Sequence, residues 1–331
     1  MAGRRRKKSG GRSYAWRYRG RIVACVFVEV IIICALVIMI GWNKGVKEWF
    51  EQFEQPVLKE VDISGINSPN AILMQARGGK ILGEINGEAQ IYPASMTKIM
   101  TVILGIENFD NLDEKITLTN EMFSGLYEQD ATQAGFQPGE EVRVIDLLYG
   151  AMLPSGAECC IALADTISGS EADFAELMNK KARKLGMENT HFCDSTGLHN
   201  PDHYSTVKDI AVLMKYCIKN DTFREIVETS RHSTGVTNIH PDGITYYSTM
   251  FKNLSDPTVT GGKILGGKTG YTSEAGHCLV SFAEIEGREY IFVSAGASGA
   301  DGNTIPHIQD AVTVYNRVGA AIEEKMNDNN K

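Results

Sequence analysis

The chain has 331 residues, of which 43% are hydrophobic and 22% are charged, a composition typical of a folded globular protein. Residues 1–21 include nine Lys or Arg and no acid, whereas the remainder has 24 basic and 41 acidic side chains. This acidic balance disfavours a nucleic-acid-binding role for the main body of the protein.

The first long apolar stretch follows the basic residues directly. Residues 22–40 are almost unbroken apolar sequence between Trp16 and Trp42, long enough to cross a bilayer as a helix. No small-residue cleavage site follows, which argues against a cleaved signal peptide. We therefore expect a basic cytoplasmic tail over residues 1–21, a single transmembrane anchor over residues 22–41, and all later residues on the outer side of the cell membrane.

Two features in or near this anchor can each be interpreted in more than one way. Glu29 interrupts the apolar stretch and costs about 2 to 3 kcal/mol if charged at the bilayer centre. It is protonated, paired with another membrane helix, or simply tolerated there. The juxtamembrane linker, residues 42–59, has an apolar stripe at helical spacing that either lies on the membrane surface or packs on the domain. The stripe consists of Val46, Trp49, Phe50 and Phe53.

A folded domain is expected over residues 60–325, followed by a polar tail over residues 326–331. Near its start, residues 71–75 and 80–85 read as a β-hairpin around a Gly-Gly turn. The hairpin leads to an apolar helix that begins near Ser95. Residues 109–139 are polar and irregular, which predicts loops or short helices.

Later segments change from helical to strand periodicity. We expect helices from Val142 to Met152, over residues 157–167 and over residues 174–185, then strands, then a closing helix. The strands cover residues 263–270, 277–283 and 290–295, and the closing helix covers residues 308–318. This order predicts an α+β fold in which helices flank an antiparallel sheet built from both chain ends.

The first chemical motif is S-x-x-K at Ser95-Met96-Thr97-Lys98. One helical turn separates the hydroxyl from the amine, so the amine can take the hydroxyl proton. The first N–H groups of the helix lie beside the hydroxyl and are suited to an oxyanion site. By itself, the same spacing is also that of a capping serine followed by a surface lysine.

Two further motifs follow. Ser155-Gly156-Ala157 lies on a bend between two helices, where Ser155 either projects into a cleft or caps a helix. Lys268-Thr269-Gly270 lies at the end of a strand after two glycines. A cation, a hydroxyl and a residue without a side chain suit the binding of a carboxylate.

The three motifs together, about 60 and then about 110 residues apart, form the set found in penicillin-binding proteins and serine β-lactamases. The chain resembles the D-alanyl-D-alanine carboxypeptidases, low-molecular-mass penicillin-binding proteins, from about Ala71 to Ser298. The likeness includes Pro93 to Lys98, Met178 to Met187, Asn189 to Phe192, Gly197 to Asp209 and Gly267 to Ser273. It implies the DD-peptidase/β-lactamase-like fold.

The resemblance also implies roles for individual residues. Ser95 is expected to be the nucleophile, Lys98 its base and Ser155 the relay of a proton to the leaving amine. Burial and the cation of Lys268 are expected to lower the pKa of Lys98. Lys268 and Thr269, next to Gly270, are expected to hold the substrate carboxylate, and the backbone N–H groups of Ser95 and Tyr271 to form the oxyanion hole.

The implied partners are peptidoglycan stem peptides ending in D-Ala-D-Ala, with β-lactams as acylating inhibitors. Two departures from the family pattern stand out. Ala157 replaces the usual Asn of the middle motif, which weakens hydrogen bonding by about 1 to 3 kcal/mol. The short C-terminal end predicts that the β-rich second domain and C-terminal anchor of many relatives are absent. A weakly catalytic or non-catalytic penicillin-binding receptor, or a serine β-lactamase, remains an alternative.

No cofactor or metal is expected. His199 and His203 are separated by Pro201, which argues against a helical metal pair, and no H-E-x-x-H motif occurs. The sequence beyond the anchor has five cysteines, an odd number without a C-x-x-C motif, and we expect buried free thiols rather than disulfides. They are Cys159, Cys160, Cys193, Cys217 and Cys278.

Overall fold

The computed structural model describes residues 58–254, 256–299 and 305–329. The expected cytoplasmic tail, the transmembrane anchor with Glu29, and the linker up to residue 57 lie outside the described residues. Within the described ranges, no helix is both long and apolar enough to cross a bilayer.

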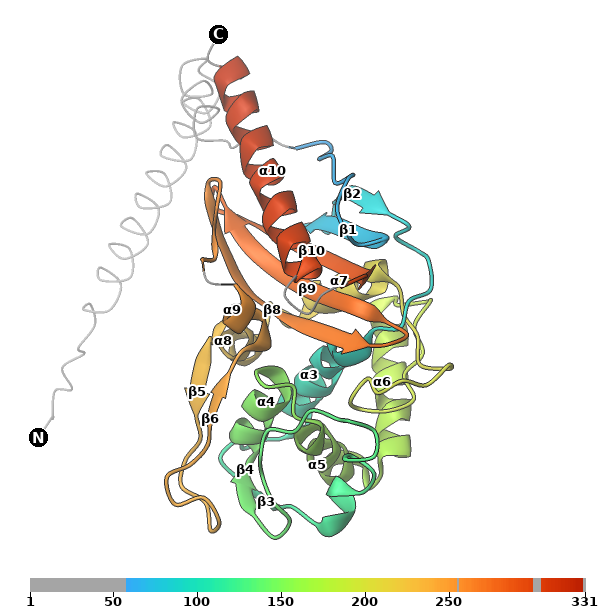
Figure 1. Ribbon diagram of the computed structural model, residues 1–331, viewed down its shortest axis with the longest axis vertical. Coiled ribbons are helices and arrows are strands. Elements are labelled where there is room, and N and C mark those ends of the chain that lie inside the picture. Colours follow the sequence, from blue (N-terminus) through green and yellow to red (C-terminus); the bar gives the residue numbers. More distant parts are fainter. Residues whose placement is uncertain (1–57, 255, 300–304, 330–331) are drawn as a thin grey trace, which may run out of the picture. The chain divides into compact units, whose positions relative to one another are not determined.

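An antiparallel six-stranded sheet organises the domain (Figure 1). Its strands, in order across the sheet, are β2 (Ile81–Ile85), β1 (Asn70–Gln75), β10 (Arg288–Ala297), β9 (Gly276–Ile285), β8 (Gly262–Thr272) and β7 (Thr258–Val259). Strand β1 pairs with β10 along its whole length, from Asn70 opposite Ala295 to Gln75 opposite Tyr290. This pairing confirms the expected α+β fold with a sheet made from both ends of the chain.

Both faces of the sheet are buried, because successive side chains point to opposite faces and each face packs on helices. Ile72 belongs to the larger core on one face, and its neighbour Leu73 to a second core on the other. Strands β9 and β10 therefore read as continuous apolar runs rather than as alternating ones.

Helices cover the sheet on both sides (Figure 1). They are α3 (Lys98–Asn108), α4 (Val144–Met152), α5 (Ala157–Ser168), α6 (Glu171–Leu185), α7 (Val207–Cys217), α8 (Asp221–Glu228), α9 (Thr249–Asn253) and α10 (Pro306–Asn329). Helix α10 packs on β9 and β10 across the second core, while α3 lies among α4, α5, α7 and α8 in the larger core. Every residue from Lys98 to Gly105 of α3 is buried, so this helix is the central support of the domain.

Short elements fill the remaining connections. They are the 3-10 turns η1 (Ala94–Thr97) and η2 (Asn120–Phe123), the hairpin of β3 (Lys115–Thr117) with β4 (Glu141–Arg143), and the hairpin of β5 (Arg231–Ser233) with β6 (Thr245–Tyr247). The structure corrects the sequence at two boundaries. Val142 lies in β4 rather than in a helix, and α10 continues to Asn329.

Residues 326–329 of the expected polar tail belong to α10. Met326 extends the apolar stripe of α10 and packs against the second core, which keeps the helix intact beyond its polar neighbours. The cysteine interpretation is confirmed for four thiols, since Cys159, Cys160, Cys217 and Cys278 are free and buried. Cys193 is also free but half-exposed.

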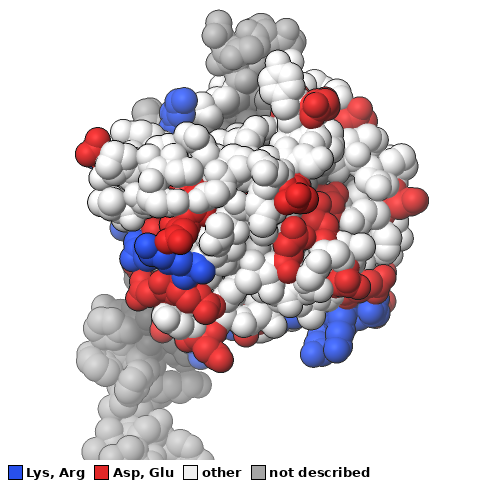
Figure 2. Space-filling view, turned by 90° about the horizontal axis from the view of Figure 1, so that it is seen from below, with Lys and Arg blue, Asp and Glu red and all other residues white. Residues whose placement is uncertain are grey.

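The surface of the domain has the acidic balance that the sequence indicates. Figure 2 shows the face seen from below Figure 1, where Asp and Glu side chains are more widespread than Lys and Arg. A basic surface suited to a polyanion is not seen on this face.

Candidate active site

The nucleophile motif lies in a tight turn at the start of the central helix. Ser95 is the second residue of η1, and Lys98 begins α3 one turn later. Ala94 has φ +46°, an uncommon conformation for a residue with a side chain, and the turn leaves Ser95 half-buried rather than fully enclosed. Lys98 Nζ donates a hydrogen bond to Ser95 Oγ at 3.1 Å.

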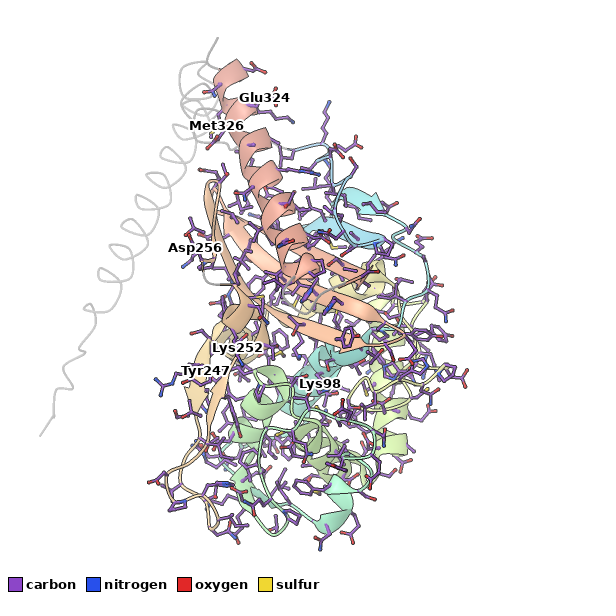
Figure 3. All side chains as sticks on the ribbon, viewed as in Figure 1. Lys98, Tyr247, Lys252, Asp256, Glu324 and Met326 are labelled. Carbon is purple, nitrogen blue, oxygen red and sulfur yellow. The ribbon has the colours of Figure 1, made fainter. Side chains whose placement is uncertain are left out.

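Lys98 is almost completely buried, with 3% of its surface exposed, and Figure 3 shows it in the interior of the domain. Its Nζ also donates to the carbonyl oxygen of Thr196 at 2.6 Å. Burial lowers the pKa of Lys98, because the charged form loses its hydration, while nearby acidic groups such as Asp194 and Glu158 oppose this shift. The direction of the net shift favours the neutral amine that a base must be.

Ser155 lies in the bend between α4 and α5, with φ +73° and 6% of its surface exposed. Lys268 Nζ from β8 donates to Ser155 Oγ at 3.0 Å. Burial lowers the pKa of Lys268 well below its ordinary value, and the positive charge of Lys98 lowers it further. Two positive charges at this separation repel each other. The pair therefore favours states in which at least one of the two amines is neutral.

Strand β8 runs directly against the nucleophile turn. A Cβ atom at Gly270 would lie 3.0 Å from the backbone nitrogen of Ser95, so only glycine allows this approach without displacement. Thr269 Oγ1 lies 2.7 Å from Thr249 Oγ1 of α9, which adds a second hydroxyl beside the strand. Tyr271 is 62% exposed, and its ring centroid lies 4.7 Å from that of His277.

The fold thus brings Ser95, Lys98, Ser155, Lys268 and Gly270 from three distant segments to one place. The hydroxyl of Ser95 lies beside an amine of lowered pKa, which is the arrangement of an activated nucleophile. The buried amine of Lys268 and the threonine hydroxyls provide donors for an anionic group. The first backbone N–H groups of η1 and the adjacent edge of β8 provide donors for an oxyanion.

Sequence reasoning missed a polar network that supports this site. Asp194 accepts hydrogen bonds at 2.7 Å from the backbone N–H groups of Thr196 and Gly197, and it also contacts His203. His203 reaches Thr97 in the nucleophile turn at 2.9 Å. An Asp followed two and three residues later by Thr and Gly is a turn signal that the sequence shows, but the partners of that turn are far away in the sequence.

The middle motif is held by a second buried carboxylate. Glu158 is fully buried, and its Oε1 accepts from the backbone N–H groups of Ala134 and Gly135 at 2.6 and 2.9 Å. Burial raises the pKa of Glu158, although these backbone donors oppose the shift. Glu158 therefore fixes the irregular segment before Phe136 to the bend that presents Ser155. Ala157, the position of the usual Asn, is buried as the first residue of α5.

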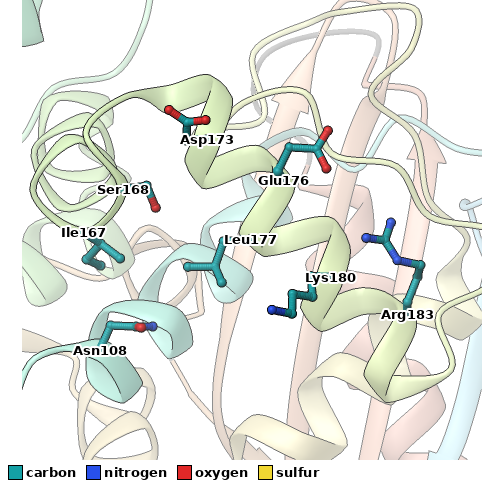
Figure 4. Close-up of a pocket in the computed structure, with 8 residues that line it drawn as sticks. All are labelled: Asn108, Ile167, Ser168, Asp173, Glu176, Leu177, Lys180 and Arg183. Carbon is teal, nitrogen blue, oxygen red and sulfur yellow. The ribbon is translucent and has the colours of Figure 1, made fainter.

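The described surface includes a small pocket beside the site and a larger hollow away from it. A small pocket next to the nucleophile turn is lined by Tyr92, Pro93, Ala94, Leu198, His199 and Thr272, among others. A larger hollow of about 540 Å³ lies between α3, α5 and α6 (Figure 4). It shares no residue with the site above, and acidic and basic side chains of α6 are mixed along it, so it does not select a ligand of one charge. In the described ranges, no group of three His, Cys, Asp or Glu is arranged to hold a metal ion.

Comparison with known proteins identifies the family. A sequence profile of D-alanyl-D-alanine carboxypeptidases matches residues 57–299. The chain is 35% identical over 233 residues to the D-alanyl-D-alanine carboxypeptidase DacF of Bacillus subtilis, a match that covers 69% of this chain and 57% of that protein. It is also 35% identical over 236 residues to the D-alanyl-D-alanine carboxypeptidase of Streptomyces strain K15, covering 69% and 78% of the two chains. The chain thus spans less than two thirds of the Bacillus relative.

The fold comparison agrees with the sequence comparison. The crystal structure of the Streptomyces K15 DD-transpeptidase superposes with a TM-score of 0.69 at 29% identity, and the match covers 79% of this chain and all of that one. The profile match includes all three motifs and nearly the whole described sheet. The chain therefore belongs to the D-alanyl-D-alanine carboxypeptidase family.

Proposed function

We propose that the protein is a serine-type D-Ala-D-Ala carboxypeptidase that removes the terminal D-alanine of peptidoglycan stem peptides. The observation that supports this function most directly is the hydrogen bond of 3.1 Å between Lys98 Nζ and Ser95 Oγ, in a site where burial lowers the pKa of the amine. Family membership supplies the substrate class. The geometry supports the roles proposed for Ser95 as nucleophile, Lys98 as base and Lys268 as the partner of the carboxylate.

In the acylation step, neutral Lys98 takes the proton of Ser95 while Oγ bonds to the carbonyl carbon between the two D-alanines. The backbone N–H groups of Ser95 and Tyr271 stabilise the oxyanion that forms. The C–N bond then breaks, and Ser155 gives its proton to the leaving amine while it receives the proton held by Lys98, so that Lys98 is neutral again. Free D-alanine and an ester on Ser95 are the products of this half-reaction.

The carboxylate of the substrate binds at the edge of β8. Lys268 provides the positive charge and Thr269 a hydroxyl donor, while Gly270 lets the strand approach the nucleophile turn closely enough for the peptide to touch both. Water then attacks the ester and its proton passes to Lys98; the bond between the acyl carbon and Ser95 Oγ breaks, Lys98 returns the proton to Oγ, and the shortened peptide leaves. β-Lactams form the same ester and leave slowly.

We also propose that residues 22–41 anchor the enzyme in the cell membrane, with its catalytic domain outside. The apolar length and the nine basic residues before it support this location. Protease treatment of intact cells tests the orientation. Removal of the domain epitope with protection of an epitope at residues 1–21 is expected, and protection of the domain epitope would contradict the proposal.

The enzymatic test uses the full-length protein and its Ser95→Ala variant. Fluorescent penicillin is expected to label the wild type and not the variant, and the wild type is expected to release D-alanine from diacetyl-Lys-D-Ala-D-Ala. Labelling without D-alanine release would indicate a penicillin-binding receptor. Rapid turnover of nitrocefin would indicate a β-lactamase, and transfer of the acyl group to added glycine would indicate a transpeptidase.

A further inference from the structure

The network around Asp194 links the nucleophile turn to the residue that holds the base. Lys98 Nζ contacts the carbonyl oxygen of Thr196 more closely than it contacts Ser95, at 2.6 Å against 3.1 Å. A carbonyl accepts an N–H from either the ammonium or the amine. When Lys98 is neutral, this contact fixes one N–H, and so it restricts the lone pair to the two remaining tetrahedral positions of Nζ.

The Thr196 carbonyl is in turn held by Asp194. One oxygen of Asp194 accepts three hydrogen bonds at 2.7 Å, from the backbone N–H and the hydroxyl of Thr196 and from the backbone N–H of Gly197. Gly197 has φ +81°, and a Cβ atom there would lie 1.9 Å from the carbonyl oxygen of Ala94. The Asp194 turn therefore packs directly on the residue before the nucleophile.

The second oxygen of Asp194 lies 3.1 Å from His203 Nδ1, and His203 Nε2 lies 2.9 Å from Thr97 Oγ1. His203 is 2% exposed, and Thr97 is fully buried between Ser95 and Lys98 in the sequence. His203 Nδ1 also lies 3.2 Å from the backbone nitrogen of Cys193, and Nε2 lies beside the Thr97 hydroxyl, so the direction of each hydrogen bond depends on the tautomer. The imidazole thus ties the Asp194 turn to the turn that bears the nucleophile.

We propose that Asp194 and His203 are positioning residues for the base: through the Thr196 carbonyl they orient Lys98 so that its lone pair faces the Ser95 hydroxyl. This proposal rests on the proposed function, because it assumes that Lys98 acts as the base. Asp194 does not line the small pocket beside the nucleophile turn, whereas His203 lies at its wall. Their effect on the reaction passes through Thr196.

The pKa of Lys98, and with it the pH dependence of acylation, depends on the charged and titratable groups around this residue. Asp194 acts from the turn, Glu158, Cys159 and Cys160 act from α5, and Lys268 acts from β8. Asp194 itself faces His203 and also Glu171. The negative charge of Asp194 raises the pKa of Lys98, so its removal is expected to lower that pKa.

The test measures the rate constant for acylation by fluorescent penicillin as a function of pH, with the full-length protein. Asp194→Asn is expected to lower the maximal rate constant by about 10- to 100-fold, because the base is misplaced. It is also expected to move the acid limb of the profile to lower pH. Asp202→Asn is the matched control, since it makes the same change on an exposed residue of the same segment, and it is expected to match the wild type.

Two substitutions of His203 separate its contacts. In His203→Asn the side-chain amide sits where Nδ1 was and keeps the contact with Asp194, whereas in His203→Gln it reaches toward Thr97 instead. If Asp194 is the residue that must be held, the Asn variant retains more of the acylation rate than the Gln variant. A greater loss in the Asn variant would contradict this order.

Other outcomes overturn the proposal while leaving the proposed function intact. One such outcome is an Asp194→Asn variant whose acylation rate constant and acid limb of the pH profile equal those of the wild type. Another is a loss only in the fraction of protein that can be labelled, which is the result expected of a purely structural role. An equal loss in Asp202→Asn would also overturn it. Failure of the wild type to be acylated at all would instead reject the proposed function.

Discussion

Lys268 Nζ of strand β8 donates a hydrogen bond to Ser155 Oγ in the bend between α4 and α5, at 3.0 Å. This contact joins two motifs that are 113 residues apart. It leaves a hydroxyl and a buried amine side by side, close enough to Lys98 for the charges of the two lysines to interact. The roles proposed for Ser155 and Lys268 are therefore expected to depend on each other.

We predict that Lys268→Ala and Ser155→Ala each lower kcat/KM for diacetyl-Lys-D-Ala-D-Ala by about 10²- to 10⁴-fold, the range of a lost proton-transfer group. Because the two side chains act as a unit, the double variant is expected to lose little more than the worse single variant. Lys263→Ala, an exposed lysine of the same strand, is the control. Independent, additive losses would contradict the coupling.

We predict that Gly270→Ala slows acylation about tenfold or more. The new methyl group would lie 3.0 Å from the Ser95 nitrogen and 3.1 Å from Ala94 Cβ, so either β8 or the nucleophile turn has to move. Gly235→Ala is the control, because its nearest neighbour is Arg143 at an ordinary 3.6 Å. Stopped-flow acylation by a fluorescent penicillin measures both, and equal rates in the two variants would disprove the close approach.

We predict that Ala157→Asn raises the acylation rate about tenfold. In the described part of the chain, Lys98 Nζ donates to Ser95 Oγ and to Thr196, and an amide oxygen at the start of α5 offers a further acceptor near the substrate. A hydrogen bond contributes about 0.5 to 1.5 kcal/mol net, and about 1.4 kcal/mol corresponds to a tenfold change in rate. Ala157→Leu, of similar size but without the amide, is expected to give no gain, and an equal gain there would show that side-chain size alone matters.

We predict that Glu158→Ala lowers the free energy of unfolding by about 2 to 4 kcal/mol, because two backbone N–H groups lose their acceptor. Glu158→Gln keeps an oxygen for these donors and is expected to lose less. Urea unfolding at a fixed pH measures the difference. A larger loss in the Gln variant would show that the negative charge itself is required.

The raised pKa of Glu158 also predicts a pH dependence. The native state holds the proton more tightly than the unfolded chain does, so this group's contribution falls as pH rises from the ordinary carboxyl value through the raised value. Glu158→Gln is expected to lack this decline. An identical pH dependence in the wild type and the Gln variant would contradict the raised pKa.

For Asp194 we predict the opposite pH dependence: its contribution to the free energy of unfolding falls as the pH falls. Burial by itself raises the pKa of Asp194, but hydrogen bonds from His203 and Thr196 and the charge of His203 outweigh it and bring the value to about 2. A depressed pKa stabilises the native state above the unfolded carboxyl value, by about 2 kcal/mol, and this stabilisation is lost as pH falls from about 4 to about 2. Urea unfolding between pH 2 and 6 is expected to show this loss in the wild type and a flatter curve in Asp194→Asn.

Much of the architecture follows from local pattern. The strand runs near both ends and the apolar helix after Ser95 are visible in the sequence because their periodicities differ and glycines mark their ends. The helix from Glu171 to Leu185 ends at Gly186, which has φ +79°, as a terminal glycine predicts. The boundaries at Val142 and Met326 were wrong because tertiary pairing and packing decided them.

The sequence by itself determined the fold class and the three motifs of the site, because spacing along one helix or one strand end is a local property. Only the tertiary structure decided which partner each polar group meets. The carbonyl of Thr196 beside Lys98, the His203 link to Thr97 and the carboxylate of Glu158 under residues 134–135 all join segments far apart in the chain. Such contacts form because buried donors and acceptors have lost water and must pair with whatever group the folded backbone brings beside them, and those neighbours exist only after folding.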